Sequence, residues 1–158
     1  LDVPGGVAGM GRQNRLVFQL VGSVPVLGRA LMASMARSVK RRPDRILERG
    51  VAAAEDKALL RLPGVQAILA ESLSEAFRSG SRGPAWEMGL YARPWGFPLE
   101  DITTPVYVSH GEEDANAPVT MGRYLAATIP DCRAAFYPGE AHLHFLNRLP
   151  EILEAVSP

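Results

Sequence analysis

Two short β-rich runs in the C-terminal part of the sequence are each followed by a side chain that could do chemistry. Residues 105–109 are followed by Asp114, and residues 133–137 are followed by His142. Parallel sheets place their sites at the carboxyl ends of the strands, so we expect Asp114 and His142 to face each other across adjacent strand ends. A carboxylate that accepts the ring N–H fixes the imidazole tautomer, and the other ring nitrogen can then take a proton from a nucleophile.

A helix is predicted between these two strands, because Pro118 can open it and Pro130 ends it. A last helix is predicted over residues 150–156, with Ile152, Leu153 and Val156 buried. The order strand, helix, strand, helix is a βαβα unit, which normally has parallel strands covered by helices. Two parallel strands alone leave a hydrophobic edge, so this unit requires more sheet than the sequence supplies.

The preceding part of the chain is predicted to be helical. From residue 14 to about residue 91 the apolar residues recur at helical spacing, and no segment keeps a period of two. One predicted face carries Leu27, Leu31 and Val39. Residues 1–13 are Gly-rich and begin without Met, so we expect a connecting loop in a chain that is a piece or a processed product of a longer protein. The predicted fold class is therefore α/β, with a helical region before the βαβα unit.

The C-terminal pattern resembles the α/β-hydrolase superfamily, in which a strand ending in HG is followed by an acid and a Pro, and a later PGxxH-like turn carries the catalytic histidine. The matching residues are His110, Gly111, Asp114, Pro118, Pro138, Gly139 and His142. The resemblance implies that residues 95–158 are the C-terminal part of the hydrolase core and that residues 14–94 are its helical cap. It also implies that Asp114 and His142 are the acid and the base of a catalytic triad.

The nucleophile of that superfamily lies in a G-x-S-x-G turn between a strand and a helix, upstream of the acid. No such motif is present, and the nearest candidate, Ser79-Gly-Ser81-Arg-Gly83, follows a helical pattern and not a strand. We therefore expect the nucleophile and its oxyanion donors to lie on sequence outside this chain. The isolated chain is then expected to be nearly inert.

The resemblance implies a hydrolase, of serine type and acting on a small apolar ester or related acyl substrate, that needs no cofactor. The superfamily also contains epoxide hydrolases, dehalogenases, peptidases and haloperoxidases, and the fold does not choose among them. The partner implied is the missing N-terminal half of the hydrolase core, or further copies of the chain. The alternative is a non-catalytic interaction module that self-associates or pairs with another chain.

Other classes of site are disfavoured by the composition. His142 and His144 could bind zinc together, but no third ligand has suitable spacing, so no metal is expected. The 17 basic and 17 acidic residues cancel, and the basic run from Arg37 to Arg45 has no interleaved aromatics, so no nucleic-acid partner is expected. No apolar stretch is long enough for a membrane span. The single cysteine, Cys132, allows no internal disulfide, which favours a cytoplasmic location.

Overall fold

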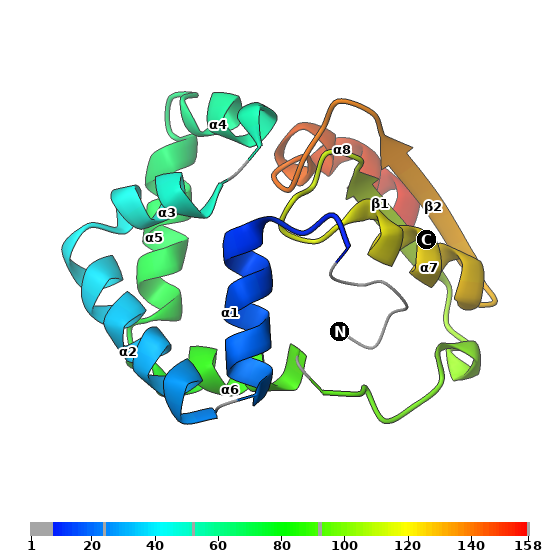
Figure 1. Cartoon of the computed structure of the whole chain (residues 1–158). Coiled ribbons are helices and arrows are strands. Elements are labelled where there is room, and N and C mark those ends of the chain that lie inside the picture. Colours follow the sequence, from blue (N-terminus) through cyan, green and yellow to red (C-terminus); the bar gives the residue numbers. More distant parts are fainter. Residues whose placement is uncertain (1–7, 24, 52, 92, 158) are drawn as a thin grey trace.

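The N-terminal part of the chain is a group of helices. The computed structural model describes residues 8–23, 25–51, 53–91 and 93–157. The helices are α1 (Arg12–Ser23), α2 (Pro25–Arg41), α3 (Pro43–Gly50), α4 (Ala54–Leu60), α5 (Val65–Ala76) and α6 (Arg82–Tyr91). They lie together beside the strand-containing part (Figure 1). Within the described ranges, no helix combines the length and the apolar character needed to cross a bilayer.

The C-terminal part is a small parallel sheet between two helices. After a single 3-10 turn, η1 (Leu99–Asp101), come β1 (Val106–Gly111), α7 (Val119–Thr128), β2 (Cys132–Tyr137) and α8 (Phe145–Val156). The strands pair in parallel over their whole length, from Val106 opposite Cys132 to Gly111 opposite Tyr137. The predicted βαβα order and the parallel pairing are confirmed. This mixed arrangement is compatible with a piece of an α/β fold.

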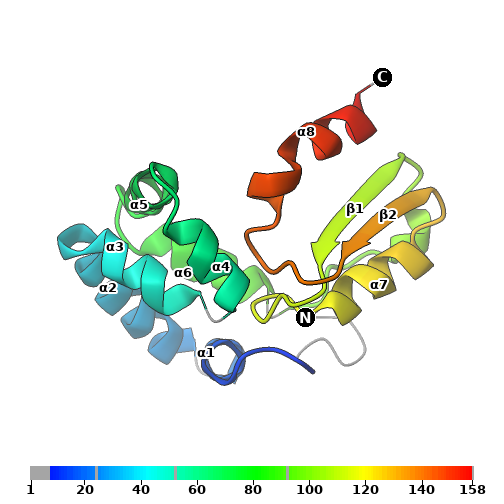
Figure 2. The same cartoon turned by 90° about the horizontal axis from the view of Figure 1, so that it is seen from above.

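The two helices of this unit cover opposite faces of the sheet (Figure 2). Successive strand residues point to opposite faces, and Ser109 and His110 follow this rule. The ring of His110 lies against Gly122 of α7, where an added Cβ would stand 2.6 Å from its Nδ1. Ser109 instead hydrogen-bonds to His144, the residue that precedes α8. Glycine at position 122 therefore lets α7 pack closely on β1.

The last helix begins earlier than the sequence indicated. We predicted a helix from Pro150, but α8 starts at Phe145 and contains Pro150. Its first turn is closed by bonds from the Leu146 amide to Leu143 O and from the Asn147 amide to His144 O. Leu146 also packs on the hydrophobic core. Because of this tertiary contact, the helix already begins ahead of Pro150, the residue that had been expected to open it.

Several residues predicted to be buried are exposed. On α8, Leu153 and Val156 are 55% and 60% exposed, so their predicted burial is wrong. On α2, Val39 is 1% exposed as its pattern indicated, whereas Leu27 and Leu31 are exposed. An apolar stripe specifies only that one side of a helix is apolar, and the structure leaves these stripes without a covering element among the described residues.

The core joins the helical part to the segment that carries His142. Val51, Leu60 and Leu143 are buried together, and Leu59, Leu69 and Leu146 pack around them. Leu60 is the last residue of α4, and Leu143 lies in the loop between β2 and α8. The loop after β2 is therefore held between α4 and the sheet.

Candidate active site

Asp114 lies in the loop between β1 and α7, and its own loop fixes its orientation. The residue is buried, and its Oδ1 accepts hydrogen bonds from the amides of Asn116 (2.7 Å) and Ala117 (2.9 Å). These two local bonds close a turn of the kind that aspartate favours ahead of a helix. They leave Oδ2 directed out of the loop, toward the end of β2.

His142 meets that second oxygen from the loop after β2. Its Nδ1 lies 2.9 Å from Asp114 Oδ2. Because an ionised carboxylate can only accept, Nδ1 carries the hydrogen and donates it. The imidazole is 46% exposed, and no described residue forms a hydrogen bond with its Nε2. The structure thus brings the two predicted site residues together and leaves one ring nitrogen accessible.

The pair shifts both ionisation equilibria toward the charged forms. Burial of Asp114 opposes its ionisation, but the hydrogen bonds from His142, Ala117 and Asn116 outweigh it and hold the pKa of the carboxyl below 3.8. The hydrogen bond with Asp114 likewise raises the pKa of His142 above 6.5, although partial burial opposes this. The charge of Asp114, and less strongly that of Asp56, adds to the rise.

The two loops can meet only because residue 111 has no side chain. A Cβ on Gly111 would stand 2.4 Å from Ala141 O and 2.5 Å from Glu140 O, both backbone atoms. Backbone bonds continue the strand pairing beyond this point, from the Glu112 amide to Tyr137 O and from the Glu113 amide to Glu140 O. The close approach therefore sets the distance between the loop of Asp114 and the loop of His142.

A second carboxylate beside the site was not singled out from the sequence. Asp56, on α4, is only 2% exposed. Its Oδ1 accepts the Leu143 amide at 2.7 Å and its Oδ2 accepts the His142 amide at 3.2 Å. The contact spans 86 residues, so local spacing could not reveal it. The sequence offered only a partial signal. Asp56 stands four positions before the apolar Leu60 and therefore on the same side of the helix, which indicates burial of its carboxylate but not its partner.

The other two histidines have structural partners. His144 is buried, with Nε2 at 2.9 Å from Ser109 Oγ and Nδ1 at 3.1 Å from Ala141 O. His110 donates from Nε2 to Ala117 O at 2.8 Å and so connects β1 to the acid-bearing loop. His142 and His144 thus have different partners. In the part of the chain that the structure describes, no three His, Cys, Asp or Glu side chains gather as metal ligands would.

The serines of residues 79–83, the nearest candidate for a nucleophile turn, do not form one. Ser79 and Ser81 lie between α5 and α6, after a helix and not after a strand. A nucleophile elbow is a sharp, strained turn, yet no described residue other than glycine has a positive φ. These serines therefore follow a helix, as the sequence pattern indicated.

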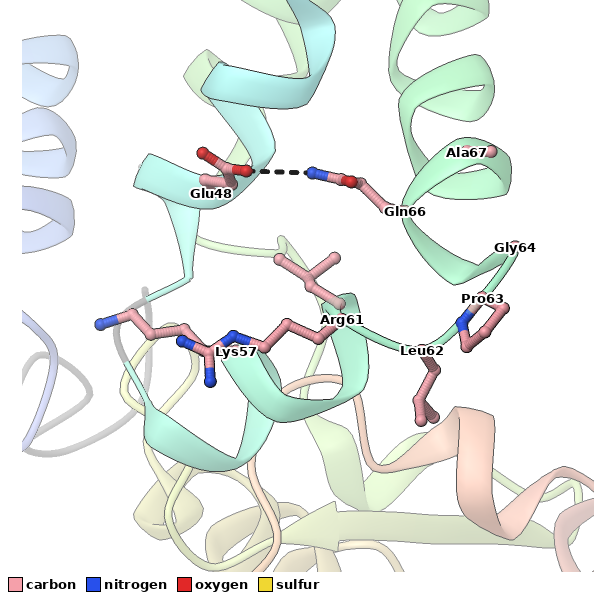
Figure 3. Close-up of a pocket in the computed structure, with 9 residues that line it drawn as sticks. Glu48, Lys57, Arg61, Leu62, Pro63, Gly64, Gln66 and Ala67 are labelled. Atoms are coloured by element: carbon pink, nitrogen blue, oxygen red, sulfur yellow. Dashed lines mark hydrogen bonds between the residues drawn. The ribbon is translucent and has the colours of Figure 1, made fainter.

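An open pocket of about 750 Å³ lies elsewhere, among α3, α4 and α5 (Figure 3). Its lining includes Lys57 and Arg61. Two further lining residues are joined by a hydrogen bond of 3.0 Å from Gln66 Nε2 to Glu48 Oε1. Neither Asp114 nor His142 lines it. This hollow is therefore separate from the acid–histidine pair.

Comparison with known proteins gives a partial similarity. No family model matches the chain. A stretch of 73 residues, 46% of the chain, is 33% identical to a pimeloyl-[acyl-carrier protein] methyl ester esterase of Aromatoleum aromaticum. The match covers 29% of that esterase, so the chain spans less than a third of its length. This partial similarity supports a relationship at the level of the α/β-hydrolase superfamily and is consistent with hydrolase chemistry.

Proposed function

We propose that this chain carries the acid and the base of a serine-type α/β-hydrolase, with Asp114 orienting His142. The observation that supports this most directly is the 2.9 Å hydrogen bond from His142 Nδ1 to Asp114 Oδ2, together with an exposed ring. Asp114 is itself fixed by two backbone amides. Its Oδ2 accepts the hydrogen on Nδ1, so the imidazole is held in the tautomer whose Nε2 can accept a proton. That is the arrangement a general base needs.

In this mechanism His142 Nε2 takes the proton from a serine hydroxyl as the oxygen attacks the ester carbonyl. The resulting imidazolium is stabilised by Asp114 and returns the proton to the leaving alcohol, which gives an acyl-enzyme. Water, activated by the same nitrogen, then releases the acid. The serine and the oxyanion donors belong to sequence outside these 158 residues, so the isolated chain should be close to inactive.

The substrate proposed is a small apolar carboxylic ester or a related acyl compound. The esterase similarity points to ester chemistry. The helical part is proposed as the cap of the active site, in which its apolar side chains would contact the acyl group. These include Trp86, Leu90 and Tyr91 on α6, all of them exposed.

The remaining part of a hydrolase core is the partner that this unit requires. Phe145, Leu149, Leu153 and Val156 form an apolar stripe on α8 and are 39–60% exposed. The sheet has two strands and therefore two unpaired edges among the described residues. Additional strands beside β1 or β2 would pair an edge, and their helices would cover the stripe.

A direct test compares the intact protein with its His142→Ala variant in hydrolysis of short-chain p-nitrophenyl esters, after the mass of the source protein has been measured. The proposal would be supported if the source protein is longer than this chain and its His142→Ala variant loses the esterase activity. Activity that is indifferent to His142, or a source protein no longer than this chain, would contradict it.

The exposed α8 stripe favours a second candidate, a non-catalytic module that self-associates or pairs with another chain. This module would give a purified 158-residue chain that is a defined dimer or heteromer without esterase activity. Sedimentation of the wild-type chain and of a Leu149→Lys/Leu153→Lys variant separates the two candidates. A discrete assembly that the double variant dissolves favours the module, whereas ill-defined aggregation favours an incomplete hydrolase core.

A further inference from the structure

The carboxylate of Asp56 is buried, and no cationic side chain that the structure describes pairs with it. At 2% exposure it is the least exposed charged side chain among the described residues, and none of their lysine, arginine or histidine side chains forms an ion pair with it. A buried carboxylate is costly unless its oxygens are hydrogen-bonded. Both oxygens of Asp56 are satisfied, one by each of two consecutive backbone amides.

Those two amides belong to His142 and Leu143, so the contact acts on the base-bearing loop itself. Leu143 also packs on Leu60, one helical turn after Asp56 on α4. The helix thus holds the loop by a polar contact and an apolar one. The ring of His142 is 46% exposed, so packing alone does not fix it, and its position depends on the backbone that carries it.

We propose that Asp56 is a positioning residue for His142, holding its loop against α4 so that the ring stays within hydrogen-bonding distance of Asp114. In this arrangement a displacement of α4 would move the histidine as well. The helical part would then contribute to the geometry of the acid–base pair in addition to any contact with a substrate. The catalytic consequence rests on the proposed function, but the contact itself does not.

The charge of Asp56 has a second effect on the same ring. Two carboxylates act on His142, Asp114 from the loop after β1 and Asp56 from α4, and both favour the protonated imidazole. His110 lies near the pair, with its Nε2 at 3.8 Å from Asp114 Oδ2. Removing the Asp56 charge should therefore lower the pKa of His142, and loosening the loop should lower it further by weakening the bond to Asp114.

The experiment compares the intact wild-type protein with its Asp56→Asn variant by NMR. Asparagine keeps the size of the side chain but offers one acceptor oxygen, so one of the two amides loses its partner. We expect the exchange of the His142 and Leu143 amides to accelerate about 5- to 100-fold and the pKa of His142 to fall. If the intact protein hydrolyses esters, kcat should fall about 10- to 100-fold while KM changes little, because the base is misplaced.

Glu55→Gln is the matched control, because it removes a charge from the neighbouring, exposed position on α4. This variant should leave exchange, titration and kcat unchanged. The proposal is overturned if Asp56→Asn leaves the exchange and the titration of His142 as in the wild type, or if Glu55→Gln shifts them equally.

A measurement without any variant keeps the test decisive if Asp56→Asn does not fold. In the wild type, the amides of His142 and Leu143 should be protected and should show scalar coupling to the Asp56 carboxyl carbon across their hydrogen bonds. Unprotected amides would overturn the proposal. If these signatures are found but the protein hydrolyses no ester, the role of Asp56 in holding the loop stands and the proposed function fails.

Discussion

Gly111 lies so close to Ala141 that a Cβ at position 111 would stand 2.4 Å from the Ala141 carbonyl oxygen. Gly111 ends the strand that leads to Asp114, and Ala141 precedes His142. This contact between backbones fixes the separation of the two loops, and with it the geometry of the acid–histidine pair.

Replacing Gly111 by alanine should therefore separate the loops. The obstructing atoms are backbone and cannot rotate away, so we expect the free energy of unfolding to fall by about 1–3 kcal/mol. The pKa of His142 should fall toward 6.5 as its bond to Asp114 lengthens. Thermal unfolding and NMR titration measure the two effects. Gly89→Ala on α6 is the control and should not be destabilising, because no described atom outside its own helix backbone and its chain neighbours lies within 4 Å of the added Cβ.

Asp114→Asn should leave the fold nearly intact and impair the base. The amide oxygen can still accept from Asn116 and Ala117, but the amide nitrogen would face His142 Nδ1 and favour the wrong tautomer. The pKa of His142 should fall, and kcat of an active intact protein should drop by roughly 10⁴-fold, as expected for a triad aspartate. Glu113→Gln, an exposed neighbour, provides the comparison. Equal activity of Asp114→Asn and the wild type would exclude a triad role.

The stability that the Asp114–His142 pair contributes should be lost at low pH and at high pH. The pKa of His142 is raised in the folded state, so its contribution is complete below pH 6.5 and is lost as the pH rises through the folded pKa. The pKa of Asp114 is lowered, so its contribution is present above pH 3.8 and is lost as the pH falls through the folded pKa.

Between pH 3.8 and pH 6.5, His142→Ala should lower the free energy of unfolding most. The loss should be roughly 1 kcal/mol, because the ring is half exposed. Urea unfolding of both proteins across pH 3–9 gives the difference curve. A difference that rises steadily with pH would contradict this linkage. The catalytic base must be neutral, so kcat/KM of an active intact protein should increase with pH through an apparent pKa above 6.5.

Packing of the helical part can be tested at α2. Val39 is 1% exposed, so Val39→Ala should remove about 2 kcal/mol from the free energy of unfolding, through lost burial and the cavity left behind. Val26→Ala on the same helix removes the same atoms from a side chain that is 70% exposed and should cost little. Denaturant midpoints of the two variants provide the measurement. Equal midpoints would show that α2 does not pack as described.

The βαβα order was predictable because its signals are local. The β-rich runs, Pro118 and Pro130 delimit β1, α7 and β2 within a residue or two, and parallel pairing then brings Asp114 to His142. The position of Asp56 was not predictable, because it depends on α4 packing against a loop 86 residues later. For the same reason the start of α8 was misplaced, since Leu146 joins a core assembled from distant segments.

The long-range core of Val51, Leu60 and Leu143 has a kinetic consequence. Helices α3 to α5 and the pairing of β1 with β2 need only chain segments that are near in sequence, whereas the loop of His142 must close on α4 across 86 residues. Closure of so long a loop is entropically costly and comes after local structure has formed. The titration of His142 should therefore reach its native value in the last phase of refolding, which makes this ring a probe of complete folding as well as a candidate base.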